Sequence, residues 1–315
     1  MPLNQQCAAL IKAVEQAGNA FEADDIEGAR AAYRGTTDLY VKSFPDMARV
    51  RNRVMPALDG GNIPVRIYNP RIAVKPPKYL PVLVFFHGGG FALGDLDTHD
   101  SVCRELAHRA SCVVVAVDYR LAPEYPFPTP VDDCLAALTW VSENAEAIGC
   151  DHNRIAIGGD SAGGNLAAVV ARRHRDRNGY QLALQLLIYP TTDFVPENNS
   201  IDENAEGFIL TKAAIEHFRS LYLEQESDWT SPYASPLRAE EFANLPPAFV
   251  ITAEFDPLRD EGRDYAEKLK AAQVPVQYQC YNGMIHGFIR MGGIVDDVTI
   301  ALDDAAMALR KAFAS

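Results

Sequence analysis

From about residue 80 onward, short apolar runs alternate with longer stretches in which apolar residues recur three and four positions apart. The short runs are rich in Val, Ile and aromatic residues, which is typical of strands covered on both faces. The longer stretches have the spacing of a helix with one buried face. Because the two alternate, the pattern predicts a parallel sheet sandwiched by helices. The predicted strands are Val82–Phe86, Cys112–Val117, Arg154–Ile157, Leu184–Tyr189, Phe249–Ala253 and Val276–Tyr281, and the predicted helices cover about 98–111, 130–148, 163–176, 211–224, 259–273 and 294–313.

The first part of the chain has a different pattern. Residues 1–45 are Ala-rich with helical spacing, and several apolar side chains, Tyr33 among them, could share one helix face. The period then changes to the alternation of half-buried strands at Val50–Val54 and Ile63–Tyr68, with the turn residues Asp59–Asn62 between them. This hairpin brings the predicted number of strands to eight.

One long segment, residues 191–235, breaks the alternation of strands and helices. Connections longer than about 12–15 residues in compact domains are usually functional or disordered, and we interpret this one as a lid packed with the N-terminal helices. The predicted organisation is an N-terminal helical cap segment, 1–47, followed by a catalytic domain, 48–315, with a cap insertion at about 192–226. An ordinary long connection is the alternative.

Composition and charge narrow the function classes. The 315 residues are 48% hydrophobic and 23% charged, which is typical of a globular protein, and the net charge is −13. An acidic chain is not attracted to nucleic acids or anionic membranes, and no apolar run approaches the length of a membrane span. The N-terminus lacks the basic and apolar pattern of a secretory signal. The six cysteines are scattered without a C-x-x-C pair, so we expect reduced thiols in a cytoplasmic protein.

A candidate nucleophile stands in the pentapeptide Gly159-Asp160-Ser161-Ala162-Gly163, which matches G-x-S-x-G. A predicted strand leads into it and an Ala-rich predicted helix follows, which is the strand–turn–helix context of a nucleophile elbow. The turn is so tight that only small residues fit around the serine. We therefore predict that Ser161 is exposed on a strained turn; a glycine-rich connection with a capping serine is the structural alternative.

The tetrapeptide His87-Gly88-Gly89-Gly90 follows another predicted strand. Ester cleavage places negative charge on the former carbonyl oxygen, and fixed N–H donors stabilise that charge. Glycines let the backbone approach closely and turn its N–H groups inward. We predict an oxyanion hole made by the N–H groups of Gly88, Gly89 and Ala162.

The serine needs a base, and the base needs an orienting carboxylate. His286 follows the last predicted strand, at the end where a parallel sheet presents its ligand-facing groups. His87 is expected to hold the glycine loop, and the other five histidines, His99 among them, mostly to lie at the surface. Asp256 follows the preceding strand and is the predicted partner of His286, with Asp260 and Glu254 as runners-up. The order Ser161, Asp256, His286 is that of an α/β-hydrolase.

Other chemistries lack their motifs. The glycines after His87 do not fit the G-x-G-x-x-G spacing, and the chain has no G-x-x-x-x-G-K-[ST]. No H-E-x-x-H or Cys/His spacing for a metal occurs either. We therefore expect neither a metal nor a cofactor.

Taken together, these motifs resemble those of the hormone-sensitive-lipase-like esterases (bacterial family IV), and the resemblance extends over nearly the whole chain. Asp160 at the second elbow position resembles the Asp-containing branch, whose members often dimerise. The resemblance implies the α/β-hydrolase fold, an eight-stranded, mostly parallel sheet with a helical cap. It also implies hydrolysis of short- to medium-chain carboxylic esters without a cofactor, and a homodimer. It rests on His87–Gly90, Asp118–Glu124, Gly159–Asn165, Asp256–Glu261, His286–Phe288 and the lid-like Asn204–Thr211.

The predicted function is a serine carboxylesterase acting on a small-molecule ester. An apolar acyl pocket is predicted from Tyr33, Phe208, Ile209 and Leu210, for which core packing of the cap is an equal alternative. An amidase, an arylacetamide-type deacetylase or an acyltransferase would use the same three residues. A non-catalytic ligand receptor on the same fold and a true lipase are weaker alternatives, the first because His286 is present and the second because no basic amphipathic helix is evident.

Overall fold

The structure is a computed structural model that describes residues 2–19, 21, 25–41, 43–72 and 78–314. Its described part contains one eight-stranded sheet in the order β1-β2-β4-β3-β5-β6-β7-β8. The strand β2 pairs antiparallel with both of its neighbours, and the remaining pairs are parallel. This confirms the predicted mostly parallel sheet with an opening hairpin. The strands are β1 (Met47–Pro56), β2 (Asn62–Pro70), β3 (Leu80–Phe86), β4 (Val113–Val117), β5 (Cys150–Asp160), β6 (Gln185–Ile188), β7 (Ala248–Phe255) and β8 (Val276–Ile285).

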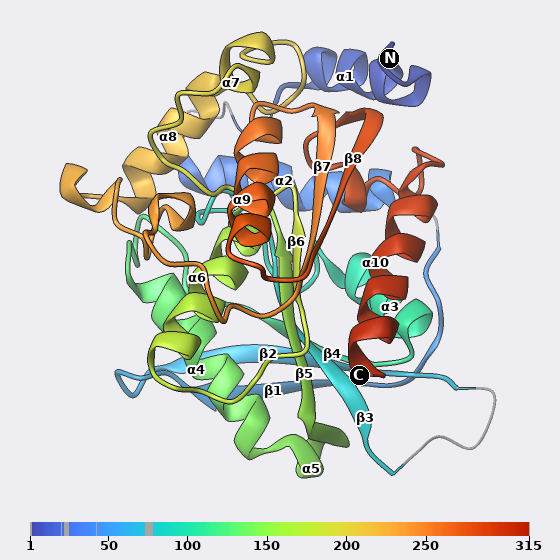
Figure 1. Ribbon diagram of the computed structural model, residues 1–315. Helices are drawn as coiled ribbons and strands as arrows, with labels where there is room; N and C mark the ends of the chain where they lie inside the picture. The colour runs from blue at the N-terminus through green and yellow to red at the C-terminus, as the bar shows by residue number, and fades with distance from the viewer. Residues whose placement is uncertain (1, 20, 22–24, 42, 73–77, 315) are drawn as a thin grey trace.

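Helices cover both faces of the sheet, as Figure 1 shows. On one face α4, α6 and α9 pack against the sheet, and on the other α3 and α10 do so. Each begins close to where the apolar period predicted, because its apolar stripe must be buried against the sheet. These helices are α3 (Asp100–Ala110), α4 (Thr129–Glu143), α6 (Ala162–Asp176), α9 (Arg259–Ala271) and α10 (Val298–Phe313), with the short α5 (Ala145–Ile148) and the 3₁₀ turns η2 (Glu226–Asp228), η3 (Pro236–Arg238) and η4 (Phe288–Arg290).

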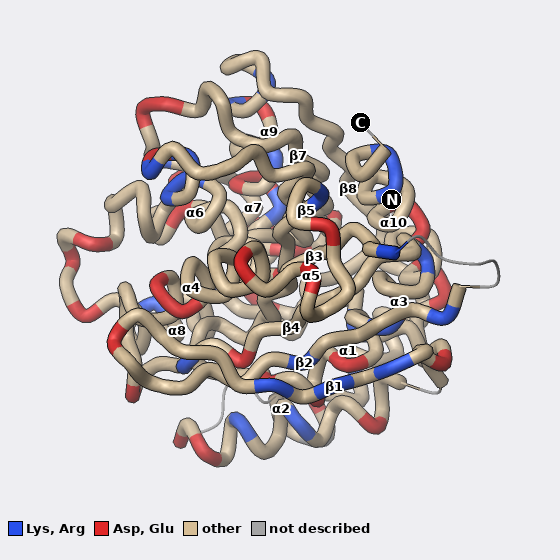
Figure 2. The backbone as a smooth tube through the Cα atoms, turned by 90° about the horizontal axis from the view of Figure 1, so that it is seen from below, with Lys and Arg blue, Asp and Glu red and all other residues tan. Residues whose placement is uncertain are grey.

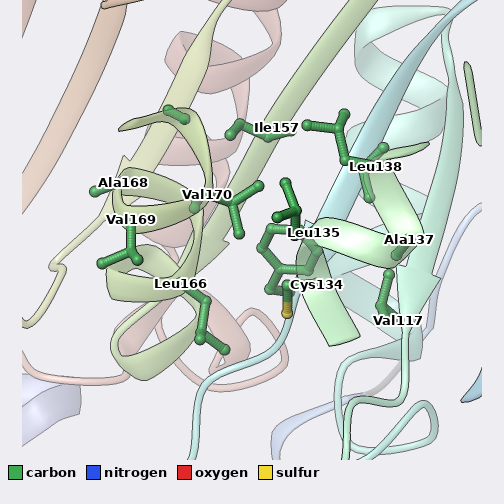
Figure 3. Close-up of a cluster of buried hydrophobic side chains, with 14 of the residues drawn as sticks. Val117, Cys134, Leu135, Ala137, Leu138, Ile157, Leu166, Ala168, Val169 and Val170 are labelled. Atoms are coloured by element: carbon green, nitrogen blue, oxygen red, sulfur yellow. The ribbon is translucent and has the colours of Figure 1, made fainter. Parts of the chain in front are cut away.

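The central strands are buried on both sides. Along β3, Val82, Val84 and Phe86 point into the layer of α4 and α6, while Leu83 and Phe85 point into the layer of α3 and α10. All five side chains are fully buried. Figure 3 shows the first layer, in which α4 and α6 interdigitate above the sheet. Burial of such side chains stabilises the fold by about 1.5–3 kcal/mol each, as an upper value.

The outer strand β1 carries arginines at alternate positions. The strand contains Arg49, Arg51 and Arg53, and Figure 2 shows blue segments of Lys and Arg along β1, although the chain as a whole is acidic. Charged side chains along an edge strand oppose pairing with a strand of another molecule. The arginines therefore protect the open edge of the sheet at β1.

Four further helices lie beyond the carboxyl ends of the central strands: α1 (Gln5–Ala17), α2 (Ile26–Tyr40), α7 (Ser200–Glu203) and α8 (Lys212–Tyr222). In Figure 1, α1, α7 and α8 lie together in the upper part of the molecule. Tyr33 of α2 belongs to the same apolar cluster as Leu210 and Phe218 of the segment around α8. The N-terminal helices thus pack with the segment that interrupts the alternation of strands and helices. In the part of the chain that the structure describes, no helix has both the length and the apolar character needed to cross a membrane.

Candidate active site

Ser161 lies on a sharp turn between the end of β5 and the start of α6. Its φ is 56° and its ψ is −120°, a conformation that non-glycine residues rarely adopt. The flanking glycines allow the turn, because a Cβ on Gly159 or Gly163 would meet the carbonyl oxygen of Phe86 at 2.3 or 2.0 Å. The strained serine that the sequence predicted is therefore present, on a turn that larger residues could not form.

Three side chains from separate elements form one hydrogen-bonded series. The Oγ of Ser161 lies 2.9 Å from Nε2 of His286, and Nδ1 of His286 lies 2.8 Å from Oδ2 of Asp256. Asp256 is fully buried, and its second carboxylate oxygen accepts the N–H of Leu258 at 2.8 Å. With its other oxygen occupied in this way, the carboxylate is held in one orientation beside the imidazole.

The runner-up carboxylates have other partners. Asp260 pairs with Arg259 and Arg263 and accepts the N–H of Ser200. Glu254 accepts the N–H of Gly283. Of the three candidates, Asp256 is the one that hydrogen-bonds to the imidazole of His286.

The glycine loop after β3 differs from the prediction at Gly88. The Gly88 N–H donates to Oδ1 of Asp160 at 3.0 Å, so this donor already has an acceptor. Gly89 and Gly90 line the cavity that contains Ser161, whereas Gly88 is not among its lining residues. The N–H of Ala162 belongs to the first turn of α6, where helix N–H groups lack an intrahelical acceptor. Gly88 is thus better described as an anchor of the loop than as an oxyanion donor.

Asp160 anchors this loop from a buried position, a role that sequence reasoning missed. Its carboxylate also lies 3.2 Å from Nε2 of His99. Burial alone would raise the pKa of Asp160, but the nearby His99, Arg290 and His87 outweigh it and the net shift is downward. His99 is itself 1% exposed and is the exception to the prediction that most of these five histidines lie at the surface. His99 lies in a polar stretch of the sequence, and that stretch does not reveal that the histidine will be buried beside a carboxylate distant in the chain.

His87 holds the other side of the loop, as the sequence suggested. Its Nδ1 lies 2.9 Å from the Gly88 oxygen, and its ring stacks on Tyr119, whose hydroxyl donates to the His87 oxygen. Burial, with the proximity of His99, lowers the pKa of His87 to about 4. His87 is therefore neutral near pH 7 and acts on the loop through packing and hydrogen bonds.

A cavity of about 450 Å³ opens above Ser161 and His286. Of the four predicted pocket residues, Tyr33, Ile209 and Leu210 line it. Phe208 does not; its ring packs against Phe255 at 5.2 Å between centroids. Neighbouring residues in an irregular segment point in different directions, and the sequence could not say which would face the cavity.

Arg290 is a lining residue that sequence reasoning did not single out. Its guanidinium lies 4.1 Å from the centre of the Tyr33 ring, and its Nε donates to the Thr98 oxygen. It is 5% exposed and connects η4, just after His286, with helix α2. Among the described residues, no group of three or more His, Cys, Asp or Glu side chains is arranged to hold a metal ion.

The sheet topology and the elbow after β5 define an α/β hydrolase. The family described as "alpha/beta hydrolase fold" matches residues 83–290. The chain belongs to this family, within its hormone-sensitive-lipase-like esterases.

Curated relatives and solved structures agree with that assignment. The esterase LipI of Mycobacterium tuberculosis is 46% identical over 258 residues, covering 81% of this chain and 80% of LipI. The carboxylesterase NlhH of the same organism is 43% identical over 297 residues, covering 92% of this chain and 90% of NlhH. The ester-hydrolase EH1AB1 from the metagenome of Lake Arreo has a TM-score of 0.94 at 39% identity, over 99% of this chain and 100% of that one. The hyperthermophilic esterase from Pyrobaculum calidifontis has a TM-score of 0.91 at 40% identity, over 99% of both chains. The chain is a carboxylic ester hydrolase, as its sequence predicted.

Proposed function

We propose that this carboxylic ester hydrolase cleaves small-molecule esters of short to medium acyl length, with Ser161 as the nucleophile, His286 as the base and Asp256 as its orienting partner. The observation that carries the proposal is the unbroken series of hydrogen bonds, 2.9 Å from Ser161 to His286 and 2.8 Å from His286 to Asp256. A serine hydroxyl is a weak nucleophile until a neighbouring base accepts its proton.

In the first half-reaction, Oγ of Ser161 attacks the ester carbonyl carbon while its proton moves to Nε2 of His286. The bond to the alcohol oxygen then breaks, and the alcohol leaves with the proton from Nε2. In the second half-reaction, water attacks the acyl-enzyme as Nε2 accepts its proton, and the proton returns to Oγ as the acid departs. The buried Asp256 keeps Nδ1 protonated and stabilises the imidazolium that forms.

The negative charge on the carbonyl oxygen is stabilised in this proposal by the N–H groups of Gly89, Gly90 and Ala162. The two glycines line the cavity, and Ala162 is the first residue of α6. One such donor contributes about 10²–10³ in rate. Gly90 thus replaces Gly88 among the donors predicted from the sequence, because the Gly88 N–H is bonded to Asp160.

The cavity supports the proposed substrate size. Its volume is about 450 Å³, and apolar side chains such as Tyr33, Leu210 and Phe218 make much of its wall. We also propose that α1, α2 and the segment 192–226 act as the cap, since these side chains come from α2 and from that segment.

The exposed apolar residues Ile300 and Met307 of α10, beside the edge strand β8, support the proposed homodimer. The six unpaired cysteines support a cytoplasmic location.

The test is a hydrolysis profile over p-nitrophenyl esters of increasing acyl length, with and without a serine-directed organophosphate. We expect the highest kcat/KM at short to medium acyl chains, and complete loss of activity when one equivalent of the organophosphate is bound at Ser161. Activity that survives stoichiometric labelling would overturn the assignment of the nucleophile. Faster cleavage of matched p-nitroanilides would favour an amidase, and transfer to an added alcohol would favour an acyltransferase.

A further inference from the structure

Two cavities meet at one thin wall of the protein. Besides the cavity of about 450 Å³ above Ser161, a second one of about 680 Å³ lies between α1 and the segment 205–216. Val14, Gly18, Asn19 and Ile209 line both. Among the residues that the structure describes, these four therefore form the wall that the two spaces share.

Ile209 is the strained member of this wall. Its φ is 71°, a left-handed conformation that is a genuine outlier for a β-branched residue. The turn around it is closed by the Leu210 N–H, which donates to the Phe208 oxygen at 2.9 Å. From α1's side, Nδ2 of Asn19 donates to the Ile209 oxygen at 2.7 Å. Such strain persists only where the surroundings hold it, and it gathers at ligand sites and switch regions.

The second cavity has an acidic rim. Glu15, Glu206 and Glu216 line it and are exposed. Lys212, the one lysine among the described lining residues, is ion-paired to Asp202 at 2.7 Å, so its charge is already balanced. The rim therefore disfavours an anionic group and tolerates a neutral or cationic one.

We propose that Ile209 is the specificity-determining partition between the two cavities, and that the second cavity receives the far end of an ester too long for the first. That end is neutral or cationic, because the rim is acidic. The inference rests on the proposed function, since it places the reacting carbonyl at Ser161. It adds a second space to the site and names the residue that limits access to it.

Two variants open the wall from different elements. Ile209→Gly removes the whole side chain and suits the left-handed backbone. Val14→Ala removes bulk from the wall on α1, where alanine is a good helix former. Ile215→Ala is the matched control, because Ile215 lines the first cavity but not the second. It enlarges the first cavity without opening the wall.

The substrates are p-nitrophenyl butyrate as a reference and three p-nitrophenyl esters of equal, decanoyl length that end in methyl, trimethylammonium or carboxylate. The same three ends are placed on the alcohol side in a second series of butyrates. In at least one series, we expect Ile209→Gly and Val14→Ala to raise kcat/KM relative to butyrate by about tenfold for the methyl and trimethylammonium ends. The carboxylate end should gain least, and added salt should narrow that difference.

The inference is overturned if both wall variants give the same profile as Ile215→Ala, or if the carboxylate end gains as much as the others. Val14→Ala decides the matter if Ile209→Gly fails to fold. Hydrolysis of p-nitrophenyl butyrate by the wild type separates the two proposals. If butyrate is cleaved at Ser161 and the wall variants show no selectivity for length, the inference about Ile209 fails while the proposed function stands.

Discussion

The glycines of the elbow and the glycines of the region above it are used differently. At the elbow, a Cβ on Gly159 or Gly163 would collide with the backbone of Phe86. Around α1 and α2, a Cβ on Gly18 or Gly35 would meet no atom within 4 Å from the described residues beyond its chain neighbours and its own helix backbone. Glycine is required at 159 and 163 because two chain segments approach closely there. No such close approach requires glycine at 18 or 35.

The helices of the two regions also differ in how many of their side chains are buried. In α6, every residue from Ala162 to Arg172 is buried, whereas α2 buries only Ala29, Tyr33 and Tyr40 among its described side chains. Catalysis requires reacting groups to be held within a fraction of an ångström, and close packing provides this. The helices above the site shape a cavity, which tolerates exchange of side chains. The difference teaches that, in the proposed function, the sheet region holds the reacting groups and the upper helices determine which substrates fit.

The largest effect is expected from removing the hydroxyl of Ser161, the proposed nucleophile, which tests the proposed role of the sheet region. We expect Ser161→Ala to lower kcat for p-nitrophenyl butyrate by about 10³–10⁶ while the fold is retained. The measurement is steady-state kinetics with circular dichroism to confirm folding. Ser220→Ala, an exposed serine on α8, is the matched control and should keep its activity. A Ser161→Ala protein with near-wild-type turnover would contradict the proposed mechanism.

The next largest effect is expected from filling the elbow. A Cβ on Gly163 would lie 2.0 Å from the Phe86 oxygen, which belongs to β3 and cannot move without disturbing the sheet. We expect Gly163→Ala to lower the free energy of unfolding by about 3 kcal/mol or more. Chemical denaturation measures the change. A Gly163→Ala protein of wild-type stability would show that the elbow is less tightly packed than the structure indicates.

A smaller effect on stability is expected from the carboxyl group of Asp118, which follows β4 at the same end of the sheet. Burial, with the neighbouring Asp95 and Asp97, raises the pKa of Asp118 to about 6. The folded state then holds this proton more tightly than the unfolded state, so the contribution of Asp118 to stability is full below pH 4 and is lost as the pH rises through 6. We expect Asp118→Asn to raise the free energy of unfolding at pH 8 by about 1–3 kcal/mol and to change it little at pH 4. Equal effects in denaturation at the two pH values would contradict this.

The smallest effect is expected in the upper region. Gly35 lies inside α2 with open space around it, and its φ is not in the left-handed range. We expect Gly35→Ala to raise the free energy of unfolding by about 0.5–1 kcal/mol, because alanine restricts the unfolded chain. Chemical denaturation beside Gly163→Ala makes the comparison direct. Destabilisation by both alanines would remove the contrast between the two regions.

The fold could be predicted to a large extent because period and composition are local properties. The run Val82–Phe86 reads as a strand buried on both sides, and β3 pairs on both sides in the sheet. The elbow could be predicted for the same reason, since Ser161 and its small neighbours are contiguous in the chain. The partners Asp256 and His286 followed from the rule that loops at the carboxyl ends of parallel strands meet at one edge.

Where the structure differs from the prediction, the residues lie close to the predicted site, but their N–H groups or side chains point elsewhere than expected. Gly88 and Gly90 are two residues apart, and the hydrogen bond of the Gly88 N–H to the buried carboxylate of Asp160 leaves Gly90 as the proposed oxyanion donor. Phe208 and Ile209 are adjacent, yet one packs on Phe255 and the other lines the cavity. His99 resembles a surface residue in the sequence, but in the fold it is buried beside Asp160.

The amino-acid order alone therefore specified the sheet, the strained serine and the three side chains that the fold joins by hydrogen bonds, because these depend on local patterns and on a general rule of topology. Tertiary structure decided which N–H of the glycine loop bonds to Asp160, which side chains line the cavity, and that Ile209 lines a second cavity as well. Those features depend on contacts between segments far apart in the chain, such as Asp160 with Gly88 and Asn19 with Ile209. The pattern of residues along the chain does not specify such contacts, because they form only when distant segments are brought together by folding.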